Sequence, residues 1–98
     1  MLVRIVKLSL EENNIEEFLT NFNNQKLSIR NFPGCQFLEL YQDKHSKNIF
    51  FTYSYWDNEE ALNSYRHSEL FKGIWSITKP MFNDKPEAWS INKLESLV

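Results

Sequence analysis

The sequence predicts an α+β fold in which one antiparallel sheet is covered on one face by helices. Two observations support this prediction. Four strand-like segments and two helix-like regions follow one another in the order β-α-β-β-α-β. Each helix-like region carries apolar residues at helical spacing, as expected of helices that pack on a sheet. The 98 residues are predicted to form a single domain over residues 1–98.

The first half of the chain begins with a predicted strand over residues 2–10, where the pattern of apolar residues roughly alternates. Asn14 and Glu17 are predicted to cap a helix, because the Asn oxygen accepts a free backbone N–H and the Glu side chain reaches back. This helix is expected to run to about Arg30. The turn Asn31-Phe32-Pro33-Gly34 ends it, since Pro disfavours helix before it and Gly permits positive φ.

Two further strands are predicted over residues 35–42 and 49–56, joined by a polar hairpin loop. The second of them gives the strongest local signal, because it alternates large side chains along its whole length. One face is predicted to carry Ile49, Phe51, Tyr53 and Tyr55, and the other Phe50, Thr52, Ser54 and Trp56. Bulky groups on both sides indicate that neither face is simply exposed to water.

The second half is predicted to start a helix at the capping pair Asp57 and Glu60. Ser68 is predicted to cap a further helical stretch, which Pro80 kinks or ends. A last strand is expected over residues 89–93. The whole order is therefore the ferredoxin-like βαββαβ arrangement, with its second helical region split in two.

Composition excludes several classes of function. The net charge is −2 and the basic residues are scattered, so no nucleic-acid partner is expected. An RNA-binding module is an alternative, because the aromatics of residues 49–55 are typical of a base-stacking strand. That strand lacks the expected Lys/Arg-Gly opening, and the charge is unfavourable.

The chain shows no signal peptide, and no apolar run approaches the ~20 residues of a membrane span. No membrane partner is therefore expected. Cys35 is the single cysteine; it cannot form an internal disulfide and is best interpreted as a small buried hydrophobe. No Cys/His spacing typical of a metal site occurs. A reducing, cytoplasmic location fits this cysteine usage.

A homodimer is predicted from the aromatic content, which is 15%. Helices can cover one sheet face, and the large side chains on the other face would form an exposed apolar patch. A second copy that packs sheet on sheet around a two-fold axis would cover this patch. In the alternative interpretation, the hydroxyl groups of Tyr53 and Tyr55 make the face compatible with water.

Three segments resemble the antibiotic biosynthesis monooxygenase family: the turn Asn31–Cys35, the stretch Tyr55–Leu62 and the segment Ser68–Phe71. The resemblance implies a dimeric α+β barrel. Characterised members of the family include cofactor-independent quinol and anthrone oxygenases and haem-degrading enzymes. The resemblance therefore implies a monooxygenase that needs no cofactor and acts on a small aromatic or quinol substrate.

The sequence departs from two patterns of this family. Quinol-oxygenase members carry a His where this chain has Tyr65. Haem-degrading members place their iron-ligating His where this chain has Trp75, which argues against haem degradation here. The missing His residues leave open a non-catalytic domain of the same fold, which binds a small ligand or only dimerises.

The oxygenation implied by the resemblance requires an apolar aromatic pocket, a base and a donor for the developing oxyanion. We expect Trp56, Phe71 and Trp75 to line the pocket and bind substrate. Each of them alone is more typical of a hydrophobic core than of a binding site. Arg4 could hold a substrate oxygen or carboxylate, or lie at a strand edge, or form a salt bridge across the dimer.

His67 is the candidate base, because its ordinary pKa suits proton transfer near neutral pH. Tyr65 is the second candidate catalytic residue. The two are separated by about 200° around an ideal helix, so both can face one pocket only if the helix breaks between them. Alternatively, His67 is a solvated hinge residue.

Overall fold

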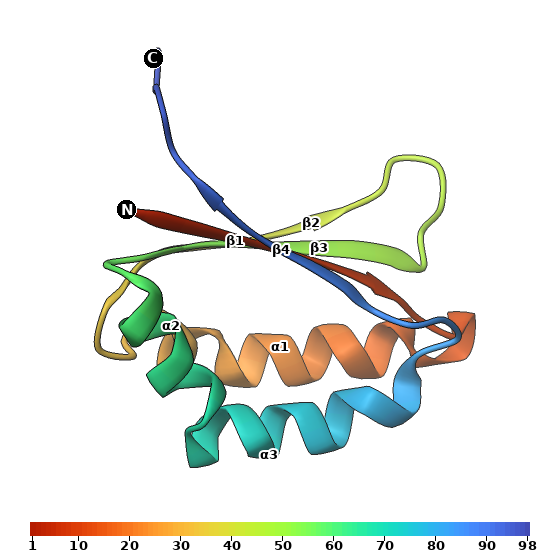
Figure 1. Cartoon of the computed structure of the whole chain (residues 1–98). Helices are drawn as coiled ribbons and strands as arrows, with labels where there is room; N and C mark the ends of the chain where they lie inside the picture. The colour runs from red at the N-terminus through yellow and green to blue at the C-terminus, as the bar shows by residue number, and fades with distance from the viewer.

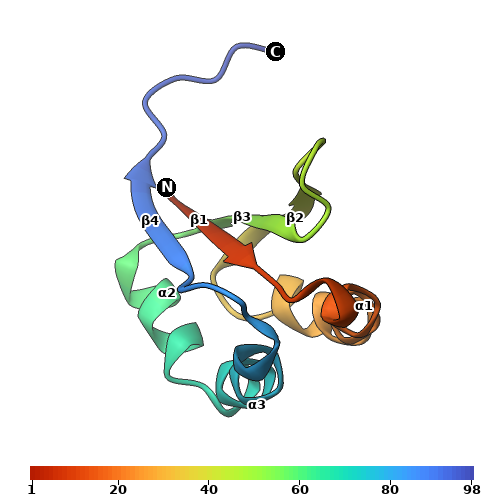
Figure 2. The same cartoon turned by 90° about the vertical axis from the view of Figure 1, so that its right-hand side faces the viewer.

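The computed structural model describes all residues 1–98 and contains one four-stranded antiparallel sheet with its α-helices on one face (Figure 1). The elements are β1 (Leu2–Ser9), α1 (Ile15–Arg30), β2 (Cys35–Gln42), β3 (Ile49–Trp56), α2 (Glu59–Arg66), α3 (Glu69–Thr78) and β4 (Glu87–Asn92). The strand order is β2-β3-β1-β4. In Figure 2 α1 and α3 lie next to each other below the sheet. The predicted ferredoxin-like α+β fold is confirmed.

The start of α1 differs from the prediction. Asn14 already has near-helical backbone angles, φ −101° and ψ 0°, and its side chain accepts no capping hydrogen bond. A short 3-10 turn, Glu12–Asn14, leads into the helix instead. The Asn14 side chain donates towards the backbone oxygen of Met81, 3.5 Å away. The predicted Asn14–Glu17 capping pair is therefore wrong, because the backbone enters the helix before that cap.

The cap of α2 lies one residue later than predicted. The backbone N–H of Ala61 donates to Oδ1 of Asn58 at 2.9 Å, so Asn58 and not Asp57 is the N-cap. Asp57 instead accepts a 2.9 Å hydrogen bond from the side chain of Gln36. Neighbouring Asp and Asn residues are equally good caps, and only the backbone conformation decides between them.

The corner between α2 and α3 agrees with the prediction. Ser68 Oγ accepts from the backbone N–H of Phe71 at 3.1 Å and donates to the backbone oxygen of Tyr65 at 2.6 Å. The helix α3 ends at Thr78, and Pro80 lies in a 3-10 turn, Lys79–Met81, that follows it. This split lets α2 pack against β3 while α3 packs against α1.

The core between the sheet and the helices consists of two separate clusters of buried side chains. One contains Leu8, Leu10, Phe18, Phe50 and Met81, and the other Cys35, Trp56 and Leu62. On β3, Phe50 and Trp56 therefore both point to the helices, as their alternation predicted. The two clusters lie at opposite ends of the layer between the sheet and the helices, and neither of them fills its middle.

The other face of the sheet carries no helix (Figure 1). It presents a cluster of aromatic rings in which Phe37 stacks on Tyr55 with centroids 4.4 Å apart, and Tyr53 lies 5.7 Å from Tyr55. Trp89 and Ile91 of β4 are 44% and 43% exposed. We call this surface the open face. No helix in the structure has the length and apolar character that crossing a membrane requires.

Candidate functional site

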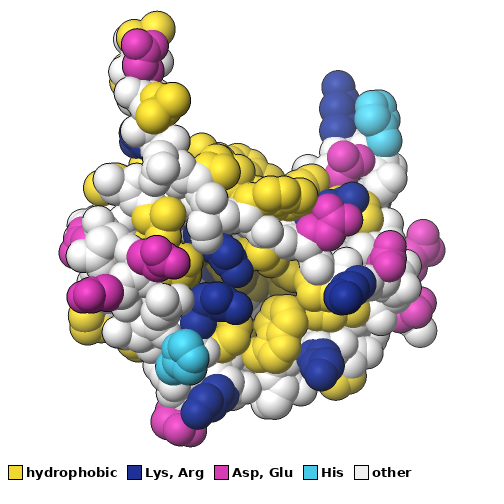
Figure 3. All heavy atoms as spheres, in the orientation of Figure 1, with side chains coloured by type: hydrophobic (Ala, Val, Ile, Leu, Met, Phe, Trp, Pro, Cys, Tyr) yellow, Lys and Arg dark blue, Asp and Glu magenta, His cyan; other side chains and the backbone are white.

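A cavity of about 380 Å³ lies between the sheet and the helices. Thirteen of its 19 lining residues are hydrophobic. The sheet contributes Arg4, Val6, Leu8, Leu38, Thr52, Ser54, Trp56 and Ala88, and members of both core clusters take part. Figure 3 shows a hollow on this side of the molecule, with Lys or Arg and hydrophobic side chains at its border. Its volume lies in the usual range of small-molecule pockets.

The cavity exists because β3 carries small side chains in the middle of its helix-covered face. Thr52 and Ser54 stand between the large residues Phe50 and Trp56. The indole N–H of Trp56 donates to Ser54 Oγ at 3.0 Å, so the polar groups of this buried pair satisfy each other. Large rings at the ends of the layer hold the helices away from the sheet, and the small residues leave the space unfilled.

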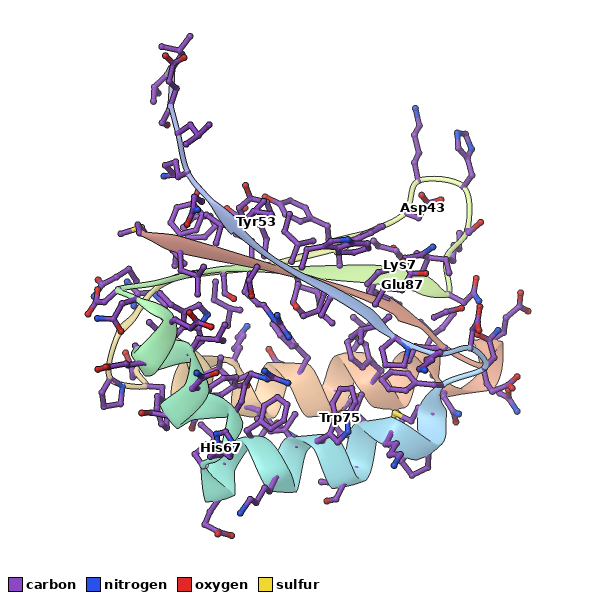
Figure 4. The ribbon with its side chains drawn as sticks, in the orientation of Figure 1. Lys7, Asp43, Tyr53, His67, Trp75 and Glu87 are labelled. Atoms are coloured by element: carbon purple, nitrogen blue, oxygen red, sulfur yellow. The ribbon has the colours of Figure 1, made fainter.

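A continuous row of aromatic rings forms one wall of the cavity. Trp56 stacks on Tyr65 with centroids 4.9 Å apart, and Tyr65 meets Phe71 edge-on at 5.2 Å. Phe71 in turn stacks on Trp75 at 5.8 Å. Figure 4 shows Trp75 pointing from α3 towards the sheet. Such a wall suits a flat aromatic ligand.

Two arginines are the only charged residues that line the cavity. Arg4 lies on β1 and donates from Nη1 to Ser90 Oγ on β4 at 2.8 Å. Arg66 lies in the last turn of α2. The salt bridge of the protein joins Lys72 to Glu69, so no carboxylate pairs with either arginine. Burial lowers the pKa of Arg4, and the positive charge of Arg66 lowers it further.

Tyr65 is a hydrogen-bond donor in this cavity and not a base at neutral pH. Burial raises its pKa well above the ordinary value of 10.0, with a smaller contribution from Cys35. The phenol therefore keeps its proton. Its hydroxyl makes no hydrogen bond to the protein, which leaves the O–H free for a ligand.

His67 does not line the cavity. It is exposed, follows the last residue of α2, and its Nδ1 lies 2.7 Å from the backbone oxygen of Asn63. Figure 4 places it at the turn between α2 and α3. The structure thus brings together Arg4, Trp56 and Tyr65 with Phe71 and Trp75, and leaves the candidate base outside. No His, Asp, Glu or Cys belongs to the lining.

Sequence reasoning missed Arg66, Thr52 and Ser54. The two small polar residues gave a usable signal, because hydroxyl side chains on the buried face of an aromatic strand cannot fill a core. Arg66 gave none, since a charged residue in the last turn of a helix is expected there anyway. The structure contains no group of three or more His, Cys, Asp or Glu side chains that could bind a metal ion.

Comparison with known structures shows the same fold in several proteins. A crystal structure of an antibiotic biosynthesis monooxygenase superposes with a TM-score of 0.90 and 17% identity, covering 97% of this chain and 100% of that one. A conserved protein from Methanosarcina mazei Go1 gives 0.88 and 20%, covering 95% and 93%. Rv0793 from Mycobacterium tuberculosis gives 0.89 and 11%, covering 99% and 98%. At these identities the likeness shows the fold alone.

Sequence comparison identifies a family but no individual curated relative. No curated protein matches the chain significantly. The family model described as antibiotic biosynthesis monooxygenase matches residues 1–74. This range takes in β1, β2, β3 and α2, which provide both arginines and all of the sheet residues that line the cavity except Ala88. The chain belongs to the antibiotic biosynthesis monooxygenase family.

Proposed function

We propose that this protein is a cofactor-independent monooxygenase that acts on a small aromatic or quinol substrate. The observation that supports the proposal is the cavity of about 380 Å³, which combines an aromatic wall with two positive charges. A flat, electron-rich ring fits the wall formed by Trp56, Tyr65 and Phe71. Arg4 and Arg66 line the same cavity, so their guanidinium groups could bind oxygen atoms of such a substrate.

The reaction needs little from the protein. A quinol that has lost a phenolic proton transfers electrons directly to O₂, and a C–O bond forms at a ring carbon. The resulting peroxide loses water, which gives a hydroxyquinone. One oxygen atom of O₂ enters the product and the other leaves as H₂O, so quinol plus O₂ balances hydroxyquinone plus water. The substrate is the reductant and O₂ the oxidant.

Substrate ionisation in this cavity depends on electrostatics, because no carboxylate or imidazole lines it. A positive charge near a phenol stabilises the phenolate and lowers the pKa of that phenol. Arg4 and Arg66 supply this charge, and the proton leaves to solvent. The free O–H of Tyr65 donates to the oxyanion as it develops.

An oxygen-electrode assay tests the proposal. Purified protein with a series of simple quinols should consume O₂ faster than the quinols oxidise alone, and ¹⁸O₂ should place one labelled atom in the product. Arg4→Gln should reduce the rate by about tenfold or more, as removal of an oxyanion donor does. Arg30→Gln, which removes the one arginine outside the cavity, should retain the rate. Oxidation at the protein-free rate with every quinol would contradict the proposal.

The alternative function is a non-catalytic domain that binds a small aromatic ligand. The absence of a base among the lining residues favours it. Both functions predict that quinols bind in the cavity, and only the enzyme consumes O₂. Saturable binding without O₂ uptake would therefore identify the binding domain.

We further infer that the protein acts as a homodimer, in which a second copy covers the open face. Tyr41, Trp89 and Ile91 expose 48%, 44% and 43% of their surface there. Exposed apolar surface of this kind is typical of an interface. We also propose a cytoplasmic location, because the single cysteine cannot form an internal disulfide and fits a reducing compartment.

A further inference from the structure

We propose that the natural ligand is an aromatic carboxylic acid, whose carboxylate lies between Arg4 and Arg66 while its ring lies on the aromatic wall. This inference rests on the proposed function only for the location of the ligand. It goes further because it names a permanent negative charge on the ligand. A quinol is neutral until it reacts, whereas a carboxylate is ionised at neutral pH.

The first support is the charge balance of the cavity. Arg4 and Arg66 line it, and no acidic residue does. The single ion pair of the protein lies elsewhere, between Lys72 and Glu69. Arg4 is half-buried and Arg66 is exposed, and a half-buried charge such as that of Arg4 is normally paired. An anionic ligand would supply the counter-charge that the chain does not provide.

The second support is the proximity of two like charges. The guanidinium of Arg66 is close enough to lower the pKa of Arg4, in addition to the larger effect of burial. Arg66 alone is explained by its place in the last turn of α2, where a cation interacts favourably with the helix dipole. The helix dipole does not explain Arg4, which lies on strand β1 and faces the cavity between the sheet and the helices.

The third support is the way in which Arg4 is held. Its Nη1 donates to Ser90 Oγ at 2.8 Å, a contact across neighbouring strands, because Arg4 pairs with Ser90 in the register of β1 and β4. A guanidinium has five N–H donors in a planar fork, so most of them remain free. Arginine forks match carboxylates in geometry as well as charge.

The charges also lie next to the end of the aromatic wall. Arg4 pairs with Ser54 in the register of β1 and β3, and Trp56 is the next residue on the same face. Arg66 directly follows Tyr65, whose ring stacks on Trp56 at 4.9 Å. A ring placed against this wall would therefore bring an attached carboxylate to both arginines.

Calorimetric titration with a matched pair of probes tests the inference. The probes are 2-naphthoate and 2-naphthamide, which share ring and shape and differ in charge. At low salt the naphthoate should bind at least tenfold more tightly, and added salt should reduce the difference. Arg4→Gln and Arg66→Gln should each abolish most of this preference, and Arg30→Gln should keep it. Arg4→Lys, which retains the charge but not the fork, should give an intermediate affinity.

Equal affinity for the two probes, or binding of neither, would overturn the inference, as would a preference that survives both cavity substitutions. Circular dichroism of each variant shows whether it is folded, and Arg66→Gln provides a second readout because Arg66 lies at an exposed helix end. The titration is done without O₂ and needs no turnover. Failure of all quinols in the oxygen assay would remove the monooxygenase proposal and leave this result unaffected.

Discussion

Gly34 controls the turn that leads from α1 into β2. Its φ is +90°, a conformation that residues with a Cβ rarely adopt. A methyl group there would also overlap the Cβ of Ala61 on α2. The backbone oxygen of Gly34 accepts from the N–H of Asp57 at 2.9 Å, so the turn is bonded to the end of β3. One small residue thus allows two separate segments to approach closely.

Gly34→Ala is expected to lower the free energy of unfolding by about 2–4 kcal/mol, because backbone strain and steric overlap add. Gly73 provides the matched control, since an added methyl there meets nothing within 4 Å on helix α3. Gly73→Ala should raise stability by about 0.5–1 kcal/mol through helix propensity. Urea denaturation measures both, and equal effects would contradict the strain argument.

Tyr65 predicts a loss of stability in alkaline solution. Its pKa in the folded protein lies above the ordinary value of 10.0, chiefly because of burial. The unfolded chain therefore loses this proton first as pH rises. The stabilisation is fully present below the unfolded pKa and is lost as pH rises through the folded pKa. Denaturation midpoints measured across this range should fall less steeply for Tyr65→Phe than for the native chain.

The control for this prediction is Tyr53→Phe. This substitution removes a phenol from the open face and leaves the cavity intact. An identical slope for the native chain and Tyr65→Phe would show that burial of the Tyr65 phenol does not contribute.

At the scale of elements, the corner between α2 and α3 depends on one hydroxyl group. Ser68 Oγ bonds both to Phe71 N at 3.1 Å and to the backbone oxygen of Tyr65 at 2.6 Å. Ser68→Ala should cost about 1 kcal/mol of unfolding free energy, as expected for a lost N-cap. Ser76→Ala on the exposed side of α3 is the control and should change stability by less than about 0.5 kcal/mol. Thermal unfolding followed by circular dichroism gives both values.

The bounds of the strands were easier to predict from the sequence than the caps of the helices. The bounds of β2 and β3 were predicted correctly, because a period-two pattern meets strong turn residues at both ends. The caps at Asn14 and Asp57 were not, because an N-cap residue must itself be extended and stand directly before the helix. Asn14 is already near-helical, and Asn58 rather than Asp57 directly precedes α2. Local chemistry permits several choices there, and tertiary packing selects one.

The candidate site was only partly predictable for a different reason. The aromatic residues of the cavity wall occur at strand and helical spacing in the sequence, so Trp56, Phe71 and Trp75 were expected in one pocket. His67 was expected there as well, but the break before α3 leaves it at the surface. Arg66 lines the same cavity as Arg4, although 61 positions of the chain lie between them, and no local sequence pattern indicates that they come together.

For the whole molecule, the open face predicts association of two copies. Tyr53 lies on it, on the side of the sheet away from Trp75 (Figure 4). Tyr53→Lys should shift the protein towards a monomer at micromolar concentration, because a charge in an apolar interface is costly unless it is paired. Thr20→Lys on the exposed face of α1 is the control and should leave association unchanged. Sedimentation velocity measures both, and a native monomer of about 12 kDa would disprove the dimer.

The three tryptophans are divided between the two sides of the sheet. Trp56 and Trp75 line the cavity, and Trp89 is 44% exposed on the other side. The Trp89→Phe protein would therefore emit fluorescence only from indoles that border the empty space. A compound that enters the cavity should change this emission in the folded protein and leave the emission of the denatured protein unaffected. The molecule thus contains its own optical probe for screening compounds, without an added dye or knowledge of the reaction.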